Sequence, residues 1–228
     1  GTMDLHAGAL LQRPPGPKYT GTLHFCELGF PGALPKASTL TRFRSSLPEG
    51  FLVSLVLPPS CLTSAAGPLR FDDELEARFV WVTDAIAALA PDVLVVPTSP
   101  ALTPGQRDRD RLSAFFARLP REGRHVVWAP RGLWEREEIE HLAAREGVLP
   151  AFDPFEDPLP DGPVVYARVR TIGARSRISS GMIEDLAEFL LESGCDEAFV
   201  AIDSQRSFKE AAALQTIAEG GEAPELQE

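Results

Sequence analysis

Residues 72–97, DDELEARFVWVTDAIAALAPDVLVVP, decide the fold because they join an amphipathic helix to a buried strand. Apolar residues recur at three- and four-residue steps and form one helical stripe: Leu75, Phe79, Val82, Ile86 and Leu89. Three carboxylates at 72–74 precede the stripe, where they stabilise the positive end of the helix dipole. Pro91 ends the helix, and the apolar run at 93–97 has the length of a buried strand. A helix followed closely by a strand is the repeating unit of α/β proteins.

The same alternation continues in both directions along the chain. Short apolar runs predict eight strands at residues 5–9, 23–28, 51–57, 93–97, 125–129, 148–152, 164–169 and 199–202. Helical patterns are predicted at residues 72–90, 106–119, 135–145, 179–192 and 204–218. With right-handed crossovers, these elements predict a TIM-barrel-like (β/α)8 barrel formed as one domain by residues 3–219. Its core is expected to include Phe25, Leu55, Leu94, Val127, Val165 and Val200.

Two connections depart from the full eightfold pattern because they are rich in proline. Residues 13–20 contain three prolines and residues 153–163 contain four, so both connections are predicted to lack α-helices. An apolar surface left uncovered at these gaps would suit a partner or a dimer contact. The polar, acidic residues 220–228 are predicted to form a disordered tail.

Composition excludes several classes of function. The 228 residues carry a formal net charge of −11, which opposes binding to nucleic acid or to an anionic membrane. No run approaches the roughly 18 apolar residues of a membrane helix, and no secretory signal is visible, so we expect a cytoplasmic protein. The three cysteines and four histidines lack metal-ligand spacing, and no dinucleotide or phosphate-loop motif occurs, so neither a metal nor a cofactor is expected.

Several phrases of the sequence resemble one known family in the same order. They are MDLHAG at 3–8, LHFCEL at 23–28 with Glu27, TLTRFR at 39–44 with LPEGF at 47–51, and YARVR at 166–170. Together they resemble the YecE-like family, also called domain of unknown function 72. The resemblance implies a TIM-barrel-like fold and a pocket at the carboxyl ends of the strands. It implies no particular reaction, because the biochemical activity of that family is not established.

The chain departs from the family pattern at most of the polar strand ends. Gly29 stands where the family usually carries Asn, and Arg131 falls where its fifth strand carries His. The Glu and Arg of that same strand are absent, and Ile202-Asp203-Ser204 replaces a Phe-Asn-Asn phrase. Because these groups would line the family pocket, their replacement favours a divergent, non-catalytic member.

The remaining candidate site residues gather at the predicted carboxyl ends of the strands, which meet at one face of a barrel. They are Glu27, Arg131, Asp153, Tyr166, Arg168, Arg170 and Asp203, with Trp134 expected to line the same face. Strand alternation puts Tyr166, Arg168 and Arg170 on one side of their strand, so Arg168 is expected to point inward. Arginines placed in this way suit a phosphate or a carboxylate. The alternative is that Arg168 pairs internally with Glu27 or Asp203.

Asp153 and Asp203 suit general acid–base chemistry, with Glu27 as a further candidate, or they cap helices and turns. The segment at 171–177 forms either an anion-binding loop with Arg175 and Arg177 or a plain surface loop. Trp81 lies off the stripe of its helix, where it could meet a partner.

Two functions therefore stay open. The first is a non-catalytic binding or interaction module for a small anion or a protein partner. The second is a hydrolase or lyase that acts on a small phosphate- or carboxylate-bearing substrate. The oligomeric state is not predicted.

Overall fold

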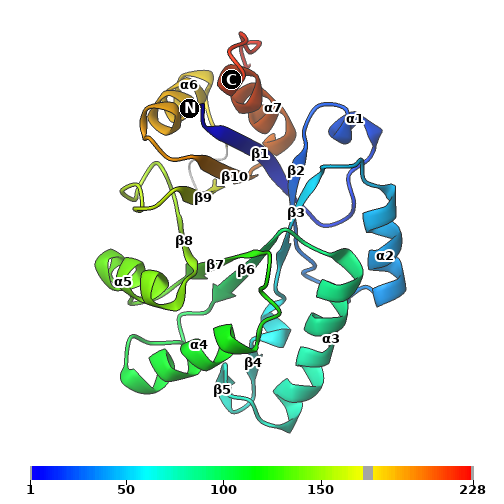
Figure 1. Ribbon diagram of the computed structural model, residues 1–228, viewed down its shortest axis with the longest axis vertical. Coiled ribbons are helices and arrows are strands. Elements are labelled where there is room, and N and C mark those ends of the chain that lie inside the picture. The colour runs from blue at the N-terminus through cyan, green and yellow to red at the C-terminus, as the bar shows by residue number, and fades with distance from the viewer. Residues whose placement is uncertain (1, 172–176, 227–228) are drawn as a thin grey trace. The chain divides into compact units, whose positions relative to one another are not determined.

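A computed structural model describes residues 2–171 and 177–226 of the chain (Figure 1). Eight parallel strands form a closed barrel in the order β1-β10-β9-β8-β7-β6-β3-β2. Their bounds are Asp4–Leu11 for β1, Phe25–Leu28 for β2, Leu52–Val56 for β3, Val93–Thr98 for β6, His125–Pro130 for β7, Leu149–Phe152 for β8, Val164–Arg170 for β9 and Glu197–Asp203 for β10. Each predicted strand corresponds to one of these, and the predicted TIM barrel is confirmed.

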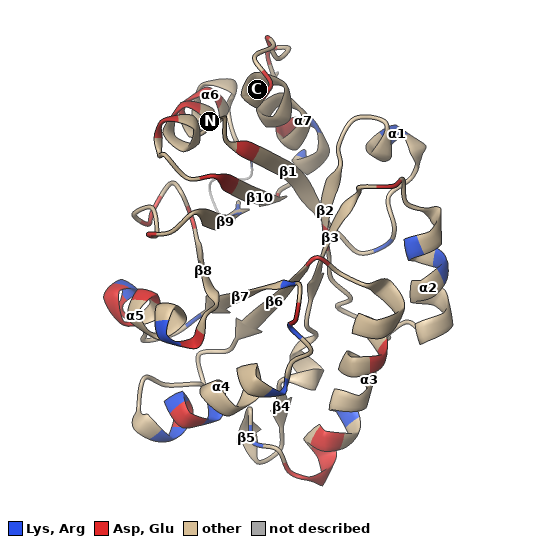
Figure 2. Ribbon diagram, viewed as in Figure 1, with Lys and Arg blue, Asp and Glu red and all other residues tan. Residues whose placement is uncertain are grey.

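The connections between the barrel strands carry the helices. Their bounds are Pro17–Thr20 for α1, Ala37–Ser46 for α2, Asp73–Leu89 for α3, Gln106–Arg118 for α4, Arg136–Glu146 for α5, Ser180–Glu192 for α6 and Ser207–Ala218 for α7. A one-turn 3-10 helix at Pro59–Cys61 and a two-stranded antiparallel sheet of β4 (Thr63–Ser64) and β5 (Gly67–Pro68) lie between β3 and α3 in the sequence. Figure 2 shows both acidic and basic residues on α3, α4 and α5.

The chain divides into two compact units, each with its own part of the barrel. Unit 1 comprises Gly1–Glu27, Gly50–Leu52 and Ala151–Glu228. Unit 2 comprises Leu28–Glu49 and Val53–Pro150. The six residues predicted for the core are all buried, three of them in each unit, at 0 or 1% exposure. The prediction of a single barrel domain with a disordered tail stays a prediction; within the described part of that tail, the Leu226 amide donates to Ser180 Oγ at 2.8 Å.

In unit 1, β1, β10 and β9 pair in parallel with a register that stacks side chains in rows. The first row consists of His6, Phe199 and Tyr166, and the second consists of Gly8, Ala201 and Arg168. The Phe25 ring of β2 meets Tyr166 and Phe199 edge-on, with ring centroids 6.3 and 5.4 Å away. These contacts place the two rows on the inner side of the strands. A Cβ at Gly8 would lie 2.2 Å from the Phe25 carbonyl oxygen, so only glycine allows β1 to approach β2 this closely.

Tyr19 of α1 joins β1 to β2 through its phenol group. The hydroxyl donates to the Phe25 carbonyl at 2.6 Å and accepts from the Ala9 amide at 2.8 Å. Burial raises the pKa of Tyr19 well above its usual value, more than the hydrogen bond from Ala9 lowers it, so the phenol keeps its proton. The helix that carries Tyr19 corrects the sequence prediction, because residues 13–20 were expected to lack one. Pro17 begins it, since proline fixes a helical φ at a position where no amide donor is needed.

The other proline-rich connection has the predicted form. Residues 153–163 contain turns and bends but no helix, so that crossover is incomplete as expected. The 13–20 crossover is also short, since α1 has only four residues.

In unit 2, α3 confirms the helix from which the sequence argument began. The Asp72 carboxylate caps it by accepting from the Leu75 amide at 2.9 Å, and the predicted stripe is buried. Trp81, off that stripe, contacts its own chain: its indole donates to the Pro35 carbonyl at 2.8 Å and meets Phe30 edge-on. The helix α2 was not predicted, because only Leu40 among its ten residues is buried and no apolar stripe marks it.

The Tyr19 bridge generates a stability prediction. Tyr19→Phe removes only the hydroxyl and strands a buried amide and a buried carbonyl, each worth about 1–3 kcal/mol. We expect the free energy of unfolding in urea to fall by about 2 kcal/mol or more. Thr20→Val, which removes a neighbouring exposed hydroxyl, should change it by less than about 0.5 kcal/mol. Equal losses of unfolding free energy in Tyr19→Phe and Thr20→Val would contradict a stabilising role for the Tyr19 hydroxyl between β1 and β2.

Candidate functional site

The inward-facing charges of unit 1 meet at Glu27, near the end of β2. Arg168 of β9 donates from Nη2 to Glu27 Oε1 at 2.6 Å and from Nε to both carboxylate oxygens at 3.2 and 3.3 Å. The Tyr166 hydroxyl donates to Glu27 Oε2 at 2.6 Å. Arg168 therefore points inward and pairs with Glu27, as one of the two sequence interpretations expected.

Burial and charge act in opposite directions on this pair. The Glu27 side chain is 1% exposed and that of Arg168 is 25% exposed. Burial lowers the pKa of the Arg168 guanidinium, but the charge of Glu27 and its hydrogen bonds outweigh burial and leave that pKa above its usual value. Arg168 thus keeps its charge, and the Glu27 carboxylate is its ion-pair partner.

Arg170 lies two residues further along β9 and forms a second, more exposed ion pair. Its Nε donates to Asp203 Oδ2 at 3.2 Å, with 53% of the Arg170 side chain and 45% of the Asp203 side chain exposed. The Asp203 carbonyl also accepts from the Thr171 amide at 3.1 Å. Asp203, at the end of β10, thus pairs with Arg170, at the end of β9, and does not cap a helix.

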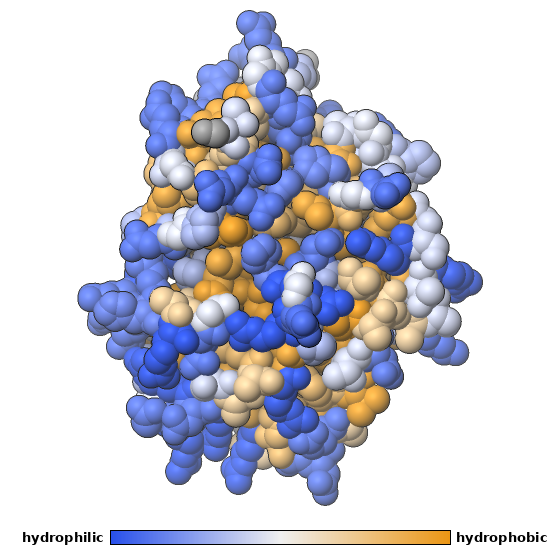
Figure 3. All heavy atoms as spheres, in the orientation of Figure 1, coloured by the Kyte–Doolittle hydropathy of each residue, from blue (hydrophilic) through white to orange (hydrophobic). Residues whose placement is uncertain are grey.

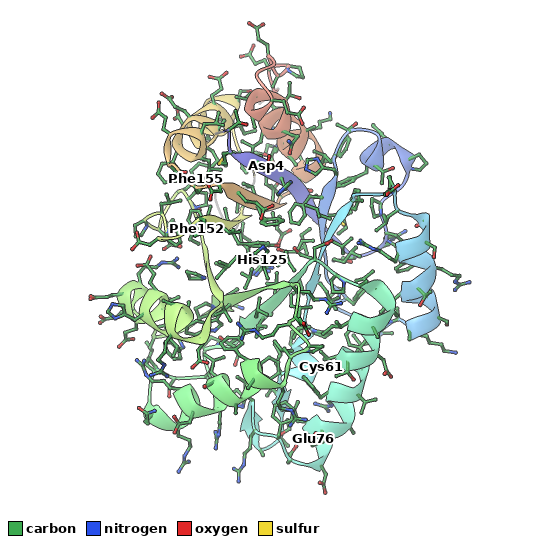
Figure 4. The ribbon with its side chains drawn as sticks, viewed as in Figure 1. Asp4, Cys61, Glu76, His125, Phe152 and Phe155 are labelled. Carbon is green, nitrogen blue, oxygen red and sulfur yellow. The ribbon has the colours of Figure 1, made fainter. Side chains whose placement is uncertain are left out.

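Asp153 immediately follows β8, in the segment whose Phe152 and Phe155 are labelled in Figure 4. Its carboxylate accepts from the Phe155 amide at 2.9 Å, and its own amide donates to the Asp157 carboxylate at 2.8 Å. These contacts are those of a turn-forming aspartate, which is the second of the two interpretations made from the sequence.

Arg131 and Trp134 belong to unit 2. The Arg131 side chain is exposed at the end of β7. Trp134 is 8% exposed; its indole donates to the Leu102 carbonyl at 3.0 Å and packs edge-on against Trp128 at 4.9 Å. Trp134 therefore belongs to the packed interior of unit 2.

Two groups of polar residues in unit 1 were missed by sequence reasoning. The first is a chain of two histidines and a glutamate, in which His6 Nδ1 lies 2.8 Å from His24 Nε2 and His6 Nε2 lies 2.9 Å from Glu197 Oε2. The second is centred on Glu210 of α7, whose carboxylate is fully buried. It accepts from the Ile178 amide at 2.6 Å and from the Ser204 hydroxyl. No local pattern marks either group, because their members come from distant parts of the sequence.

Ser204 corrects the predicted start of the last helix. We expected that helix to begin at residue 204, but α7 begins at Ser207 and Arg206 stands at its N-cap position. Ser204 instead binds Glu210 and accepts from the Arg206 amide at 3.3 Å. Of the possible anion-binding loop at 171–177, residues 172–176 lie outside the described part of the chain, so that alternative stays open.

Among the described residues, no group of three or more His, Cys, Asp and Glu side chains is arranged to hold a metal ion. Within the same residues, no helix is long and apolar enough to cross a bilayer. Figure 3 shows that hydrophilic residues dominate the edge of the face in view.

The strand order defines a TIM-barrel protein. Solved structures show which TIM-barrel proteins this chain resembles. A DUF72 family protein from Enterococcus faecalis aligns at 12% identity with a TM-score of 0.67, covering 96% of this chain and 98% of that one. Another, from Thermotoga maritima, aligns at 13% identity with a TM-score of 0.62, covering 86% and 85%. A fusion protein with a xylose isomerase-like TIM barrel has a TM-score of 0.57 at 13% identity, covering 95% of this chain and 42% of that one.

This chain therefore has the fold of DUF72 family proteins over nearly its whole length, which confirms the resemblance drawn from the sequence. No family model and no curated protein matches the sequence. The likeness to solved structures establishes the fold; the site is argued from this chain's own residues.

The Glu27–Arg168 pair generates the second prediction. Arg168→Met leaves the Glu27 carboxylate buried without its cation, which should cost about 3–5 kcal/mol of unfolding free energy. The double variant Glu27→Met/Arg168→Met removes both charges and should be more stable than Arg168→Met alone. Urea denaturation of the wild type, Glu27→Met, Arg168→Met and the double variant measures these differences. If the double variant loses as much unfolding free energy as the two single variants lose together, the pairing is contradicted.

The histidine chain generates a prediction about pH. Burial lowers the pKa of His24, and the charge of His6 lowers it further, while Glu219 opposes both effects. The unfolded chain then binds this proton more readily, with a pKa near 6.5, so stability should be present above that pH and be lost as the pH falls below it.

Urea denaturation between pH 7.5 and 5 measures this loss. His24→Gln should make the pH dependence shallower, whereas His141→Gln, at an exposed position of α5, should leave it unchanged. If the wild type and His24→Gln lose stability identically as the pH falls, His24 does not contribute to the pH dependence of stability.

Proposed function

We propose that this barrel is a non-catalytic binding module for a small anion, held at the end of β9 by Arg168 and Arg170. The observation that carries the proposal is the state of Glu27. Both of its oxygens are engaged, by Arg168 and by Tyr166. A buried carboxylate with such partners supports a structural role, in which it holds a cation in place, over a role as a general base.

The geometry of Arg168 would allow it to bind a ligand in addition to its pairing with Glu27. Nε and Nη2 face the carboxylate, whereas Nη1 donates to no described residue, and a quarter of the side chain is exposed. A guanidinium cannot lose its charge, and its remaining N–H groups keep their preference for an oxyanion. Glu27 therefore fixes the orientation of Arg168 without using all of its donors.

Arg170 would supply the second cation. Alternate residues of a strand face the same side, about 7 Å apart, so Arg168 and Arg170 offer donors to one ligand. The exposed pair of Arg170 with Asp203 uses Nε, and within the described residues neither terminal nitrogen of Arg170 donates a hydrogen bond, so both could serve a phosphate or carboxylate. Charge-assisted hydrogen bonds of this kind are among the strongest available to a protein.

The contacts of the other candidate acids support binding over hydrolysis or elimination. Asp153 holds a turn through the Phe155 amide, and Asp203 pairs with Arg170. A hydrolase or lyase would use such carboxylates for proton transfer, whereas here each has a structural partner.

Titration calorimetry with inorganic phosphate and with acetate tests the proposal. We expect the wild-type protein to bind one of the two anions, and Arg170→Ala to weaken that binding about tenfold, since a charge-assisted hydrogen bond contributes about 1.5–3 kcal/mol. Arg107→Ala, which removes an exposed arginine of α4, is the matched control and should bind as the wild type does.

Two outcomes would overturn this function. The first is the absence of binding at 10 mM phosphate or acetate, a concentration about tenfold above a weak millimolar Kd. The second is turnover of a phosphate or carboxylate ester that is lost in Asp203→Asn, because it would favour an enzyme.

A further inference from the structure

Glu210 is a fully buried carboxylate that the proposed binding of an anion does not itself use. It lies in the first turn of α7, and its two partners come from two different connections of the barrel. The Ile178 amide, which donates to it at 2.6 Å, immediately precedes the N-cap residue of α6. The Ser204 hydroxyl, which also donates to it, immediately follows β10. One side chain thus ties the start of α6 and the end of β10 to α7.

Removing a carboxyl group from water is costly, so a buried Glu needs hydrogen-bond partners within the protein. Among the described residues, its partners are the Ile178 amide and the Ser204 hydroxyl. Each hydrogen bond to this buried carboxyl group satisfies one of its oxygens and fixes the direction of the donor. The two connections are therefore held in one arrangement.

The contacts lead from Glu210 to the anion-binding arginine in three steps. Ser204 is held by Glu210 and by the Arg206 amide, which donates to its hydroxyl at 3.3 Å. Asp203 is covalently joined to Ser204, and its carboxylate accepts from Arg170 Nε at 3.2 Å. The orientation of Arg170 thus depends on where Ser204 is fixed.

We propose that Glu210 is a positioning residue for Arg170. Through Ser204, it holds Asp203 where the carboxylate orients the Arg170 guanidinium toward the ligand. This inference rests on the proposed anion-binding function, and it names a residue that contacts neither the ligand nor Arg170. Figure 1 shows the elements involved, with α6 and α7 beside β9 and β10.

Three variants separate positioning from simple stabilisation. Glu210→Ala removes both hydrogen bonds, Ser204→Ala removes only the hydroxyl, and Glu210→Gln keeps the shape of the side chain. In Glu210→Gln the amide oxygen can accept from Ile178 while the NH2 group donates to Ser204. We expect Glu210→Ala and Ser204→Ala to weaken binding of the anion that the wild type binds, phosphate or acetate, by fivefold or more, and Glu210→Gln to restore it to within twofold.

A second readout follows Arg170 without any ligand. The ¹H–¹⁵N resonance of Arg170 Nε, assigned by its loss in Arg170→Lys, reports the hydrogen bond to Asp203. It should shift in Ser204→Ala and in Glu210→Ala, and return toward its wild-type position in Glu210→Gln. Ser204→Ala keeps the test valid if Glu210→Ala does not fold.

The outcomes distinguish this inference from the proposed function. If the wild type binds neither anion but the Nε resonance shifts as expected, the binding function fails and the positioning of Arg170 stands. If the wild type binds an anion and Ser204→Ala binds it equally well with an unshifted resonance, the positioning role is overturned. Equal losses of affinity in Glu210→Gln and Glu210→Ala would also overturn it.

Discussion

The buried ion pair of Glu27 and Arg168 is the constraint on which the interior of unit 1 depends. A carboxylate at 1% exposure is stable only with its charge compensated, and Arg168 and Tyr166 compensate it with three donor groups. Room for the pair comes from its row in the sheet, where the residues opposite Arg168 on β10 and β1 are Ala201 and Gly8. Larger side chains in that row would displace the guanidinium.

The row below has the opposite character. His6, Phe199 and Tyr166 are aromatic, and Phe25 packs against two of them. This aromatic layer is adjacent to the ion pair along the strands, and a low dielectric beside the pair strengthens the attraction between its charges. Tyr166 belongs to both layers, since its ring stacks on Phe199 while its hydroxyl donates to Glu27. Layers of this kind are how barrels of eight parallel strands fill their interior.

The fold could be predicted from the sequence because its evidence is local. Each strand is a short run of mostly apolar residues, and α3 shows its stripe and its capping aspartate within 18 residues. The inward direction of Arg168 was also predictable, since strand alternation determines it. In contrast, α2 has one buried residue and no stripe, so its sequence carries no helical pattern. Glu210 and the histidine chain could not be found, because Glu210 lies 32 residues from Ile178 and His6 lies 191 from Glu197.

The exposure of the charged groups rises from the inner ion pair to the outer one, and this gradient bears on which pair a ligand would reach. Glu27 and Arg168 are 1 and 25% exposed, whereas Arg170 and Asp203 are 53 and 45% exposed. Pairs near water adjust their geometry at little cost, whereas separating a buried pair strands a charge. An anion bound as proposed would therefore meet the terminal nitrogens of Arg170 while Asp203 keeps Nε, and it would leave the Glu27–Arg168 pair intact. In that proposal the inner arginine is a fixed charge and the outer one is the adjustable contact, so the residues that orient Arg170 would matter for binding.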